Sequence, residues 1–343
     1  MQILSARNSL LLIEKMIFPA LIIFLLPLSL KAKKFPESNG SFIQKTLSFP
    51  GTISKFTSPA GTLESITIPL KRAGRLFLLE AHIDEESGNF IFDTGASELV
   101  LNSIYFRKYI TLEGEEGGGV TGSSGVVRRT RVKHLLVSDL SYSNINADVV
   151  DLGHIENRRG VKVFGLFGFS LIKDFEIVID LNHGELHLYR LDKSGQKVNA
   201  TVNAFKADLT RKIEEYHNVL FVKATIGGKM LDFCLDTGAE SNVLNSGASK
   251  KVLNTVTILR RSDLKGVGTG EADVLFGTLN DFGLGDKQVP DMTAIITNLD
   301  AMSSSYGFPV DGMLGYDFFE KGEICINLVK QEMKICFNKG EKP

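Results

Sequence analysis

The sequence predicts a mainly β protein built from two similar halves, with a few short helices. The tetrapeptide Asp-Thr-Gly-Ala occurs twice, at residues 93–96 and 236–239. A second, glycine-containing apolar block follows each copy, at residues 165–169 and 312–316. The rest of the chain is largely short apolar or alternating runs separated by Gly and Asn, a pattern typical of strands and tight turns.

Length and composition fit a globular protein of two domains. The chain has 343 residues, and a domain averages roughly 150. Hydrophobic residues make up 43% of it, enough for a large core, and the formal net charge is −1. We interpret the most basic run, residues 128–133, as a charged strand or loop, because nucleic-acid-binding proteins usually carry a clustered basic face. We therefore expect no nucleic-acid partner.

Residues 1–34 predict export. Residues 16–30 read MIFPALIIFLLPLSL, without a charge, and lysines flank them on both sides. This apolar run fits the core of a signal peptide better than a membrane span, which needs about 20 residues. Only Ala32 resembles the small residue of a cleavage site, so an uncleaved N-terminal membrane anchor is the alternative. Either interpretation places the protein in a periplasm or outside the cell, in the second case tethered to the membrane.

The remaining chain divides into a lead-in, two lobes and a linker. Residues 35–62 are rich in Ser, Pro, Gly and Thr and form a lead-in or a prosegment. Residues 63–190 and 218–337 contain the runs that we interpret as strands. Residues 191–217 are polar and mixed, and we interpret them as the linker. Short helices are expected near residues 103–109, 170–174 and 246–252.

The two lobes align over long stretches. Asp236 follows Asp93 by 143 positions, and this offset aligns residues 77–102 with residues 220–245 without a gap. The second blocks align at an offset of 147. A period of this length indicates a duplicated lobe, because the repeats of solenoid proteins run only about 20–50 residues.

The sequence does not decide whether any of the three cysteines form a disulfide. Cys325 and Cys336 would lie opposite each other if their strands form a hairpin that turns near residues 329–332. A cross-strand disulfide is then one alternative in an oxidising compartment, and two buried thiols are the other. We expect Cys234 in the core, in the strand that leads to Asp236.

A strand that ends in Asp-Thr-Gly suits acid–base chemistry. Glycine permits a sharp turn that leaves the carboxylate at its tip, where backbone N–H groups can hold it. Two such tips that face each other place two carboxylates around one water, and one stays protonated because like charges resist ionising together. The ionised group can take a proton from the water while the protonated group donates to a substrate carbonyl. Such a site needs no cofactor and no metal.

These motifs resemble the aspartic proteases of the retropepsin/pepsin superfamily. The resemblance covers about residues 64–190 and 218–337 and includes the apolar-apolar-Gly block of each half. It implies two pseudo-symmetric, acid-protease-like β-barrel lobes, with Asp93 and Asp236 as the catalytic dyad and the two threonines interlocked beneath it. The residues that would support the dyad are Thr94, Gly95, Ala96, Thr237, Gly238 and Ala239.

The resemblance also implies glycine-rich flaps that close over the substrate. Our candidates are residues 117–126 and 265–271, each between the two motifs of its half. The flap residues that we expect to bind substrate are Gly119, Val120, Thr121, Gly122, Gly266, Val267 and Gly268.

Two departures from the family have consequences. Many pepsin-like enzymes carry Ser or Thr where this chain has Ala96 and Ala239, and the missing hydroxyl should raise the pKa of each carboxyl. We therefore expect a less acidic pH optimum than that of a digestive enzyme, and a pH–rate maximum near about pH 2 would contradict this. The second half has Glu240 where the first has Ser97. A third carboxylate could disturb the dyad, but we favour a position in solvent.

We predict an exported aspartic endopeptidase that acts on polypeptides as a monomeric, single-chain pseudo-dimer. The alternative from another class is a non-catalytic peptide-binding protein of the same fold, and the two intact Asp-Thr-Gly triplets favour catalysis. A third arrangement, in which each lobe pairs with a lobe of another chain, is unnecessary because one chain holds both.

His183 and His187 form H-x-E-x-H, but the zinc signature requires H-E-x-x-H on a helix, so we expect no zinc site.

Overall fold

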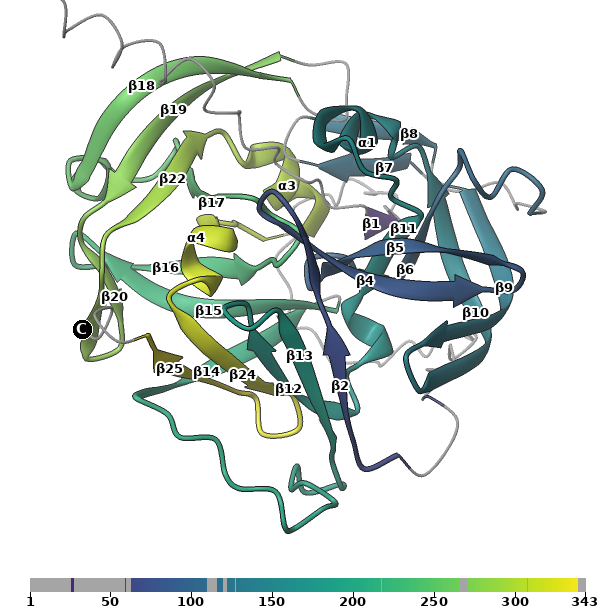
Figure 1. The fold of residues 1–343 in the computed structure, drawn as a ribbon. Helices are drawn as coiled ribbons and strands as arrows, with labels where there is room; N and C mark the ends of the chain where they lie inside the picture. The colour runs from purple at the N-terminus through teal and green to yellow at the C-terminus, as the bar shows by residue number, and fades with distance from the viewer. Residues whose placement is uncertain are drawn as a thin grey trace, which may run out of the picture.

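Strands dominate the computed structural model, in agreement with the predicted fold class (Figure 1). The structure describes residues 63–109, 116–119, 122–126, 128–216, 218–265, 271–306 and 308–338, together with Pro59 and the short strand β1 (Leu26–Pro27). Outside the described residues lie the predicted export segment apart from β1, the lead-in apart from Pro59, and the flap residues Val120, Thr121, Gly266, Val267 and Gly268. Within the described part of the chain, no helix has the length and apolar character of a membrane span.

The first half forms a closed barrel, on the right of Figure 1. Its sheet contains β3 (Lys71–Ala73), β4 (Leu76–Ile83), β5 (Glu86–Asp93), β6 (Leu99–Asn102), β9 (Arg128–Val137), β10 (Leu140–Val150) and β11 (Gly165–Gly168). The barrel closes because β4 pairs with both β5 and β9. β7 (Glu116–Gly119) and β8 (Gly122–Val126) form a separate hairpin, and β1 pairs with β7. Helix α1 (Gly153–Arg159) follows β10.

The strands of the second half pair in the same order as those of the first half, but two of the long strands are each replaced by two shorter ones. Its sheet contains β15 (Val219–Ile226), β16 (Lys229–Leu235), β17 (Asn242–Asn245), β18 (Val256–Lys265), β19 (Glu271–Leu279), β20 (Phe282–Leu284), β21 (Lys287–Val289), β22 (Met292–Thr297) and β23 (Gly312–Leu314). β19 and β20 take the place of β9, while β21 and β22 take the place of β10. Pro290 separates β21 from β22, because proline has no N–H for the ladder. The helices of this half are α2 (Lys250–Leu253), α3 (Asp300–Tyr306) and α4 (Tyr316–Phe319).

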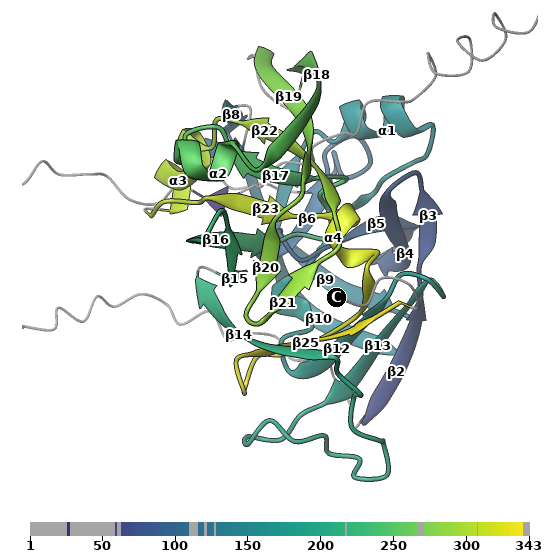
Figure 2. The same cartoon turned by 90° about the vertical axis from the view of Figure 1, so that its left-hand side faces the viewer.

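A third set of strands joins the two halves at the bottom of Figure 1. In order, it contains β2 (Ser65–Pro69), β13 (Glu185–Arg190), β12 (Phe175–Asp180), β24 (Gly322–Asn327), β25 (Glu332–Phe337) and β14 (Leu209–Tyr216). β12 from the first half pairs with β24 from the second. β14 lies within residues 191–217, and it pairs with β25 at its start and with β15 at its end. Figure 2 shows β2, β12, β13 and β25 together at the lower side, away from α1 and α3.

The apolar run before each Asp-Thr-Gly is continuous because both faces of its strand are covered. In β5, Phe90 and Phe92 face one hydrophobic cluster, and Ile91 faces a second. In β16, Phe233 faces the first of these clusters while Cys234 faces a third. A strand buried on both faces shows no polar alternation. Each buried phenylalanine adds up to about 3 kcal/mol of stability, so these runs anchor the ends that carry the aspartates.

Two of the predicted details are wrong. Residues 103–109 form turns, whereas short helices occur at 169–171 and 250–253, near the other two predicted positions. The register predicted for the hairpin of Cys325 and Cys336 is also wrong, because Cys325 lies opposite Lys334 and Cys336 lies opposite Glu323. Neither cysteine forms a disulfide, so that alternative is excluded. The hairpin turns one residue earlier than predicted, and such a shift moves each cross-strand partner by two positions.

Candidate active site

Two buried carboxyl groups meet where the two halves adjoin. Asp93 is the last residue of β5, and Asp236 directly follows β16. Their exposed fractions are only 3% and 2%, and the two side chains share a hydrogen bond. The structure therefore brings together two residues that are 143 positions apart in the sequence.

Each carboxyl is held by the backbone of its own turn. The N–H groups of Gly95 and Ala96 donate to Oδ1 of Asp93 at 2.8 and 3.1 Å. In the second half, the corresponding groups of residues 238 and 239 donate to Oδ1 of Asp236 at the same distances. Gly238 also touches the opposite carboxyl, since a Cβ on this residue would lie 2.7 Å from Oδ1 of Asp93. A larger residue at position 238 would displace that carboxyl.

Thr94 and Thr237 interlock the two turns. The N–H of Thr94 donates to Oγ1 of Thr237 at 3.0 Å, and the N–H of Thr237 donates to Oγ1 of Thr94 at 3.0 Å. Each hydroxyl donates in turn to a carbonyl of the opposite half, at Leu235 and Phe92. Both side chains are buried, so every one of these groups depends on its partner across the interface.

The second glycine block lies behind each turn. β11 pairs in parallel with β5 and antiparallel with β6, so it passes between the strands on either side of the first turn. β23 occupies the same position between β16 and β17. Glycine is required for this approach: a Cβ on Gly315 would lie 2.6 Å from the carbonyl oxygen of Ala239, and one on Gly168 would overlap the carbonyl oxygen of Glu98.

Two asparagines complete the support, and the sequence analysis assigned them no role. Asn102 donates to the carbonyl of Val163 and accepts from the N–H of Leu152. Asn245 donates to the carbonyl of Val310 and accepts from the N–H of Leu299. Each asparagine follows its aspartate by the same number of positions, and this repetition in the sequence could have indicated a shared structural role. Each asparagine fastens the end of a strand to the segment that precedes its glycine block.

Electrostatics favour one retained proton in this pair. Burial raises the pKa of Asp93, against the opposing effect of the hydrogen bond from Asp236 and of two backbone N–H groups. Burial, followed by the charge of Asp93, raises the pKa of Asp236 well above its ordinary value. Ala96 and Ala239 are buried and offer only N–H donors. The pair is thus expected to hold its shared proton on Asp236.

Glu240 does not point into solvent, and that prediction is wrong. Its side chain has an exposed fraction of 0% and forms an ion pair with Arg159 at the end of α1, through two nitrogen–oxygen contacts. The physical reason is that Arg159, whose side chain is 9% exposed, supplies the charge that permits a buried carboxylate. The pair links the first half to the residue that follows Ala239.

Two further arginines of the first half reach the same region. Arg75 donates to the carbonyl oxygen of Glu240 at 3.0 Å and forms an ion pair of 3.0 Å with Asp317. Arg72 donates to the hydroxyl of Tyr316 at 2.6 Å. Burial raises the pKa of Asp317, and the hydrogen bond from Thr293 and the charge of Arg75 oppose this. Sequence reasoning missed these contacts because no local pattern marks the arginines.

The flap candidates are only partly described. Gly119 and Gly122 lie opposite each other at the end of the β7–β8 hairpin. In the second half, Lys265 lies opposite Glu271 at the described end of the β18–β19 hairpin. The structure therefore places two of the seven predicted flap residues at a hairpin end, and the other five lie outside the described residues.

No metal site is apparent in the described part of the chain, where no three His, Cys, Asp or Glu residues gather. His183 lies in the turn between β12 and β13 and contacts Asp180 at 2.6 Å. His187 lies in β13 and contacts Thr67 at 2.9 Å. The two histidines thus have separate partners.

Comparison with known protein families gives a match over part of the chain. Residues 222–318 match the model of a family described as aspartyl protease. The matched segment contains Asp236 and the second glycine block, and it ends before β24. A search of curated proteins finds no match to this chain. The match supports a hydrolase that cleaves peptide bonds.

Proposed function

We propose that this chain is an aspartic endopeptidase in which Asp93 and Asp236 activate one water between two lobes of a single chain. The observation that carries the proposal is the pair of buried carboxyl groups, each held by two N–H groups of an Asp-Thr-Gly turn and joined by one hydrogen bond. The aspartyl protease match over residues 222–318 supports it.

The proposed reaction needs only the two carboxyls and water. Asp93, as the carboxylate, takes a proton from the water, and the oxygen attacks the peptide carbonyl carbon. Asp236 donates its proton to the carbonyl oxygen, which gives a neutral tetrahedral intermediate. The intermediate then expels the amine: the C–N bond breaks, the nitrogen takes the proton from Asp93, and the hydroxyl proton returns to Asp236. Burial raises the pKa of both carboxyls, and the charge of Asp93 raises that of Asp236 further, which supports Asp236 as the acid.

Peptide cleavage by three proteins tests the proposal. We expect the wild type to cleave members of a peptide library between about pH 3 and pH 8. Asp93→Asn and Asp236→Asn should each lower kcat/KM by at least about a hundredfold, since each removes one proton-transfer group. A wild type that binds peptides without cleaving them would support the non-catalytic alternative. Full activity in either variant would overturn the dyad.

We further propose that the protein is exported and acts as a monomer. The apolar segment at residues 16–30 supports export, as a signal peptide or an anchor. The presence of two Asp-Thr-Gly turns in one chain supports the monomer, because no second chain is needed to complete the pair. N-terminal sequencing of the secreted protein and light scattering of the purified protein would test the two statements.

A further inference from the structure

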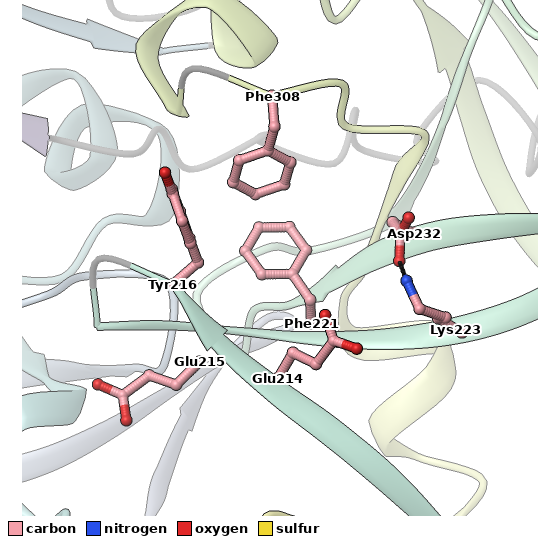
Figure 3. Close-up of a pocket in the computed structure, with 7 residues that line it drawn as sticks. All are labelled: Glu214, Glu215, Tyr216, Phe221, Lys223, Asp232 and Phe308. Carbon is pink, nitrogen blue, oxygen red and sulfur yellow. Dashed lines mark hydrogen bonds and ion pairs between the residues drawn. The ribbon is translucent and has the colours of Figure 1, made fainter. Parts of the chain in front are cut away.

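A cavity lies on the second half, where β14, β15 and β16 pair. It has a volume of about 220 Å³ and is lined by Glu214, Glu215, Tyr216, Phe221, Lys223, Asp232 and Phe308 (Figure 3). One water occupies roughly 30 Å³ of liquid, so the cavity has room for a side chain. Neither the dyad nor its supporting residues line it. It has no role in the mechanism above.

Its position relative to Asp236 follows from strand geometry. Asp232 and Cys234 of β16 lie on the same face as Asp236, because side chains alternate along a strand. At about 3.3 Å per residue, they are about 13 Å and 7 Å from Asp236 along the strand. Phe221 lies opposite Cys234, and both belong to a buried cluster that also contains Ala239. Because Asp232 lines the cavity, the cavity reaches to within about 13 Å of Asp236 along β16.

The upper wall of the cavity is aromatic. The ring of Phe308 packs edge-on against Tyr216 and Phe221, with centroid distances of 4.7 and 5.0 Å. Figure 3 shows the three rings together, with Phe308 above Phe221. Such rings accept the apolar stem of a long side chain, and their faces attract a cation.

The charge of the cavity is negative. Lys223 and Asp232 form an ion pair at 2.6 Å and largely neutralise each other. Glu214 lies opposite Phe221 across the β14–β15 pair. The hydrogen bond and charge of Asp232, followed by the charge of Glu214, raise the pKa of Lys223. Glu215 points away from the rings in Figure 3, at the rim. With the ion pair neutral, the negative charge next to the rings comes from Glu214, and Glu215 adds to it only at the rim.

We infer that this cavity binds an arginine or lysine side chain of the substrate. The inference rests on the proposed peptidase function. A basic side chain matches both features of the cavity, because its stem would pack on the rings and its charge would face Glu214. An acidic side chain would meet like charge. Since an extended peptide also advances about 3.3 Å per residue, we place the basic residue about four positions from the cleaved bond.

Cleavage-site profiling tests the inference. A peptide library is digested with the wild type, and the cleaved sequences are read by mass spectrometry. We expect Arg or Lys to be enriched at one position about four residues from the cleaved bond. Glu214→Gln should reduce the ratio of kcat/KM for an Arg peptide over its Gln counterpart by about three- to tenfold, and raising the salt from about 0.1 to 1 M should reduce it too.

A matched control is Glu85→Gln, which makes the same charge change at an exposed turn of the first half. It should leave the ratio unchanged. Cleavage without enrichment of basic residues, or a ratio unaffected by Glu214→Gln, would overturn the inference and leave the proposed peptidase intact.

If the wild type cleaves nothing, the peptidase proposal fails, and the cavity is still tested by binding. Calorimetry would then compare the full chain with Arg-containing and Gln-containing peptides. Tighter binding of the Arg peptides that is lost in Glu214→Gln supports a basic subsite. Equal binding of both peptides overturns it.

Discussion

Asp236 carries a cost of burial that depends on pH. Its pKa is raised in the folded state, so below the ordinary value of 3.8 both folded and unfolded forms are protonated and no cost arises. As pH rises above 3.8, the unfolded chain releases this proton while the folded protein keeps it, and stability falls until the folded pKa is passed. Each unit of pKa elevation corresponds to about 1.4 kcal/mol.

Asp236→Asn should therefore stabilise the protein increasingly as pH rises. We expect a gain of at least about 1 kcal/mol at neutral pH and little change near about pH 3.5, measured by urea unfolding. Asp286→Asn, at an exposed turn of the same half, is the control and should show no such pH dependence. A gain that does not change with pH would refute the burial argument.

Glu240 and Arg159 form a buried ion pair that should tolerate substitution poorly. Glu240→Gln leaves the Arg159 guanidinium in a buried site without its carboxylate, which costs about 3–5 kcal/mol in comparable pairs. Because Glu240 follows Ala239, we also expect lower kcat. The measurement is urea unfolding together with peptide cleavage. Arg158→Gln, on the exposed neighbour, should change stability by less than about 1 kcal/mol, and an equal effect of both variants would contradict the prediction.

At this scale the sequence indicated the two aspartates and their turn residues by repetition alone. It did not indicate the environment of Glu240, because its partner Arg159 lies 81 positions earlier and belongs to no motif. The asparagines at 102 and 245 were visible as a repeated letter, but their hydrogen bonds span about 50–65 positions. The spacing of residues in the sequence does not reveal which distant residue will pair with a buried polar group.

At the scale of elements, the glycine block must pass close behind the turn. Gly315→Ala would place a Cβ 2.6 Å from the carbonyl oxygen of Ala239 and 2.7 Å from that of Ser241, both of them backbone atoms. We expect a loss of about 1–3 kcal/mol and a reduced kcat, because the N–H of Ala239 holds Asp236.

Gly247→Ala is the matched control for this prediction. Its Cβ would approach only the side chain of Asn245, at 3.3 Å, so we expect a small effect on both quantities. Stability is measured by urea unfolding and kcat with a cleaved peptide. If Gly315→Ala behaves like Gly247→Ala, the close approach is not what selects glycine there.

The sequence predicted the type of secondary structure correctly where the apolar pattern is strong. It did not predict the register of the paired strands. The runs before each aspartate are strands, as expected. The hairpin that carries Cys325 and Cys336 turns one residue earlier than the sequence suggested, with Gln331 at a φ of 53°. Several residues in this region are suited to a turn, so the sequence does not determine where the turn forms. Packing of the paired strands determines the position of the turn and the strand register.

At the scale of the whole molecule, the halves share structure and should unfold together. β12 pairs with β24, β14 pairs with both β25 and β15, and the two threonines bond across the interface. We expect one transition in calorimetry, with equal calorimetric and van't Hoff enthalpies, and a coincident transition in circular dichroism. Two separate transitions would show that each lobe is stable without the other.

The mainly β class, the two Asp-Thr-Gly turns and the glycine blocks behind them could all be predicted from the sequence. These features follow from local chemistry: strand propensity, the freedom of glycine and a repeated motif. Three features could be seen only in the folded chain: the shared strands between the halves, the buried Arg159–Glu240 pair and the acidic, aromatic cavity beside β16. Each of these joins residues that are distant in the chain, and burial and charge compensation become visible only when those residues are brought together.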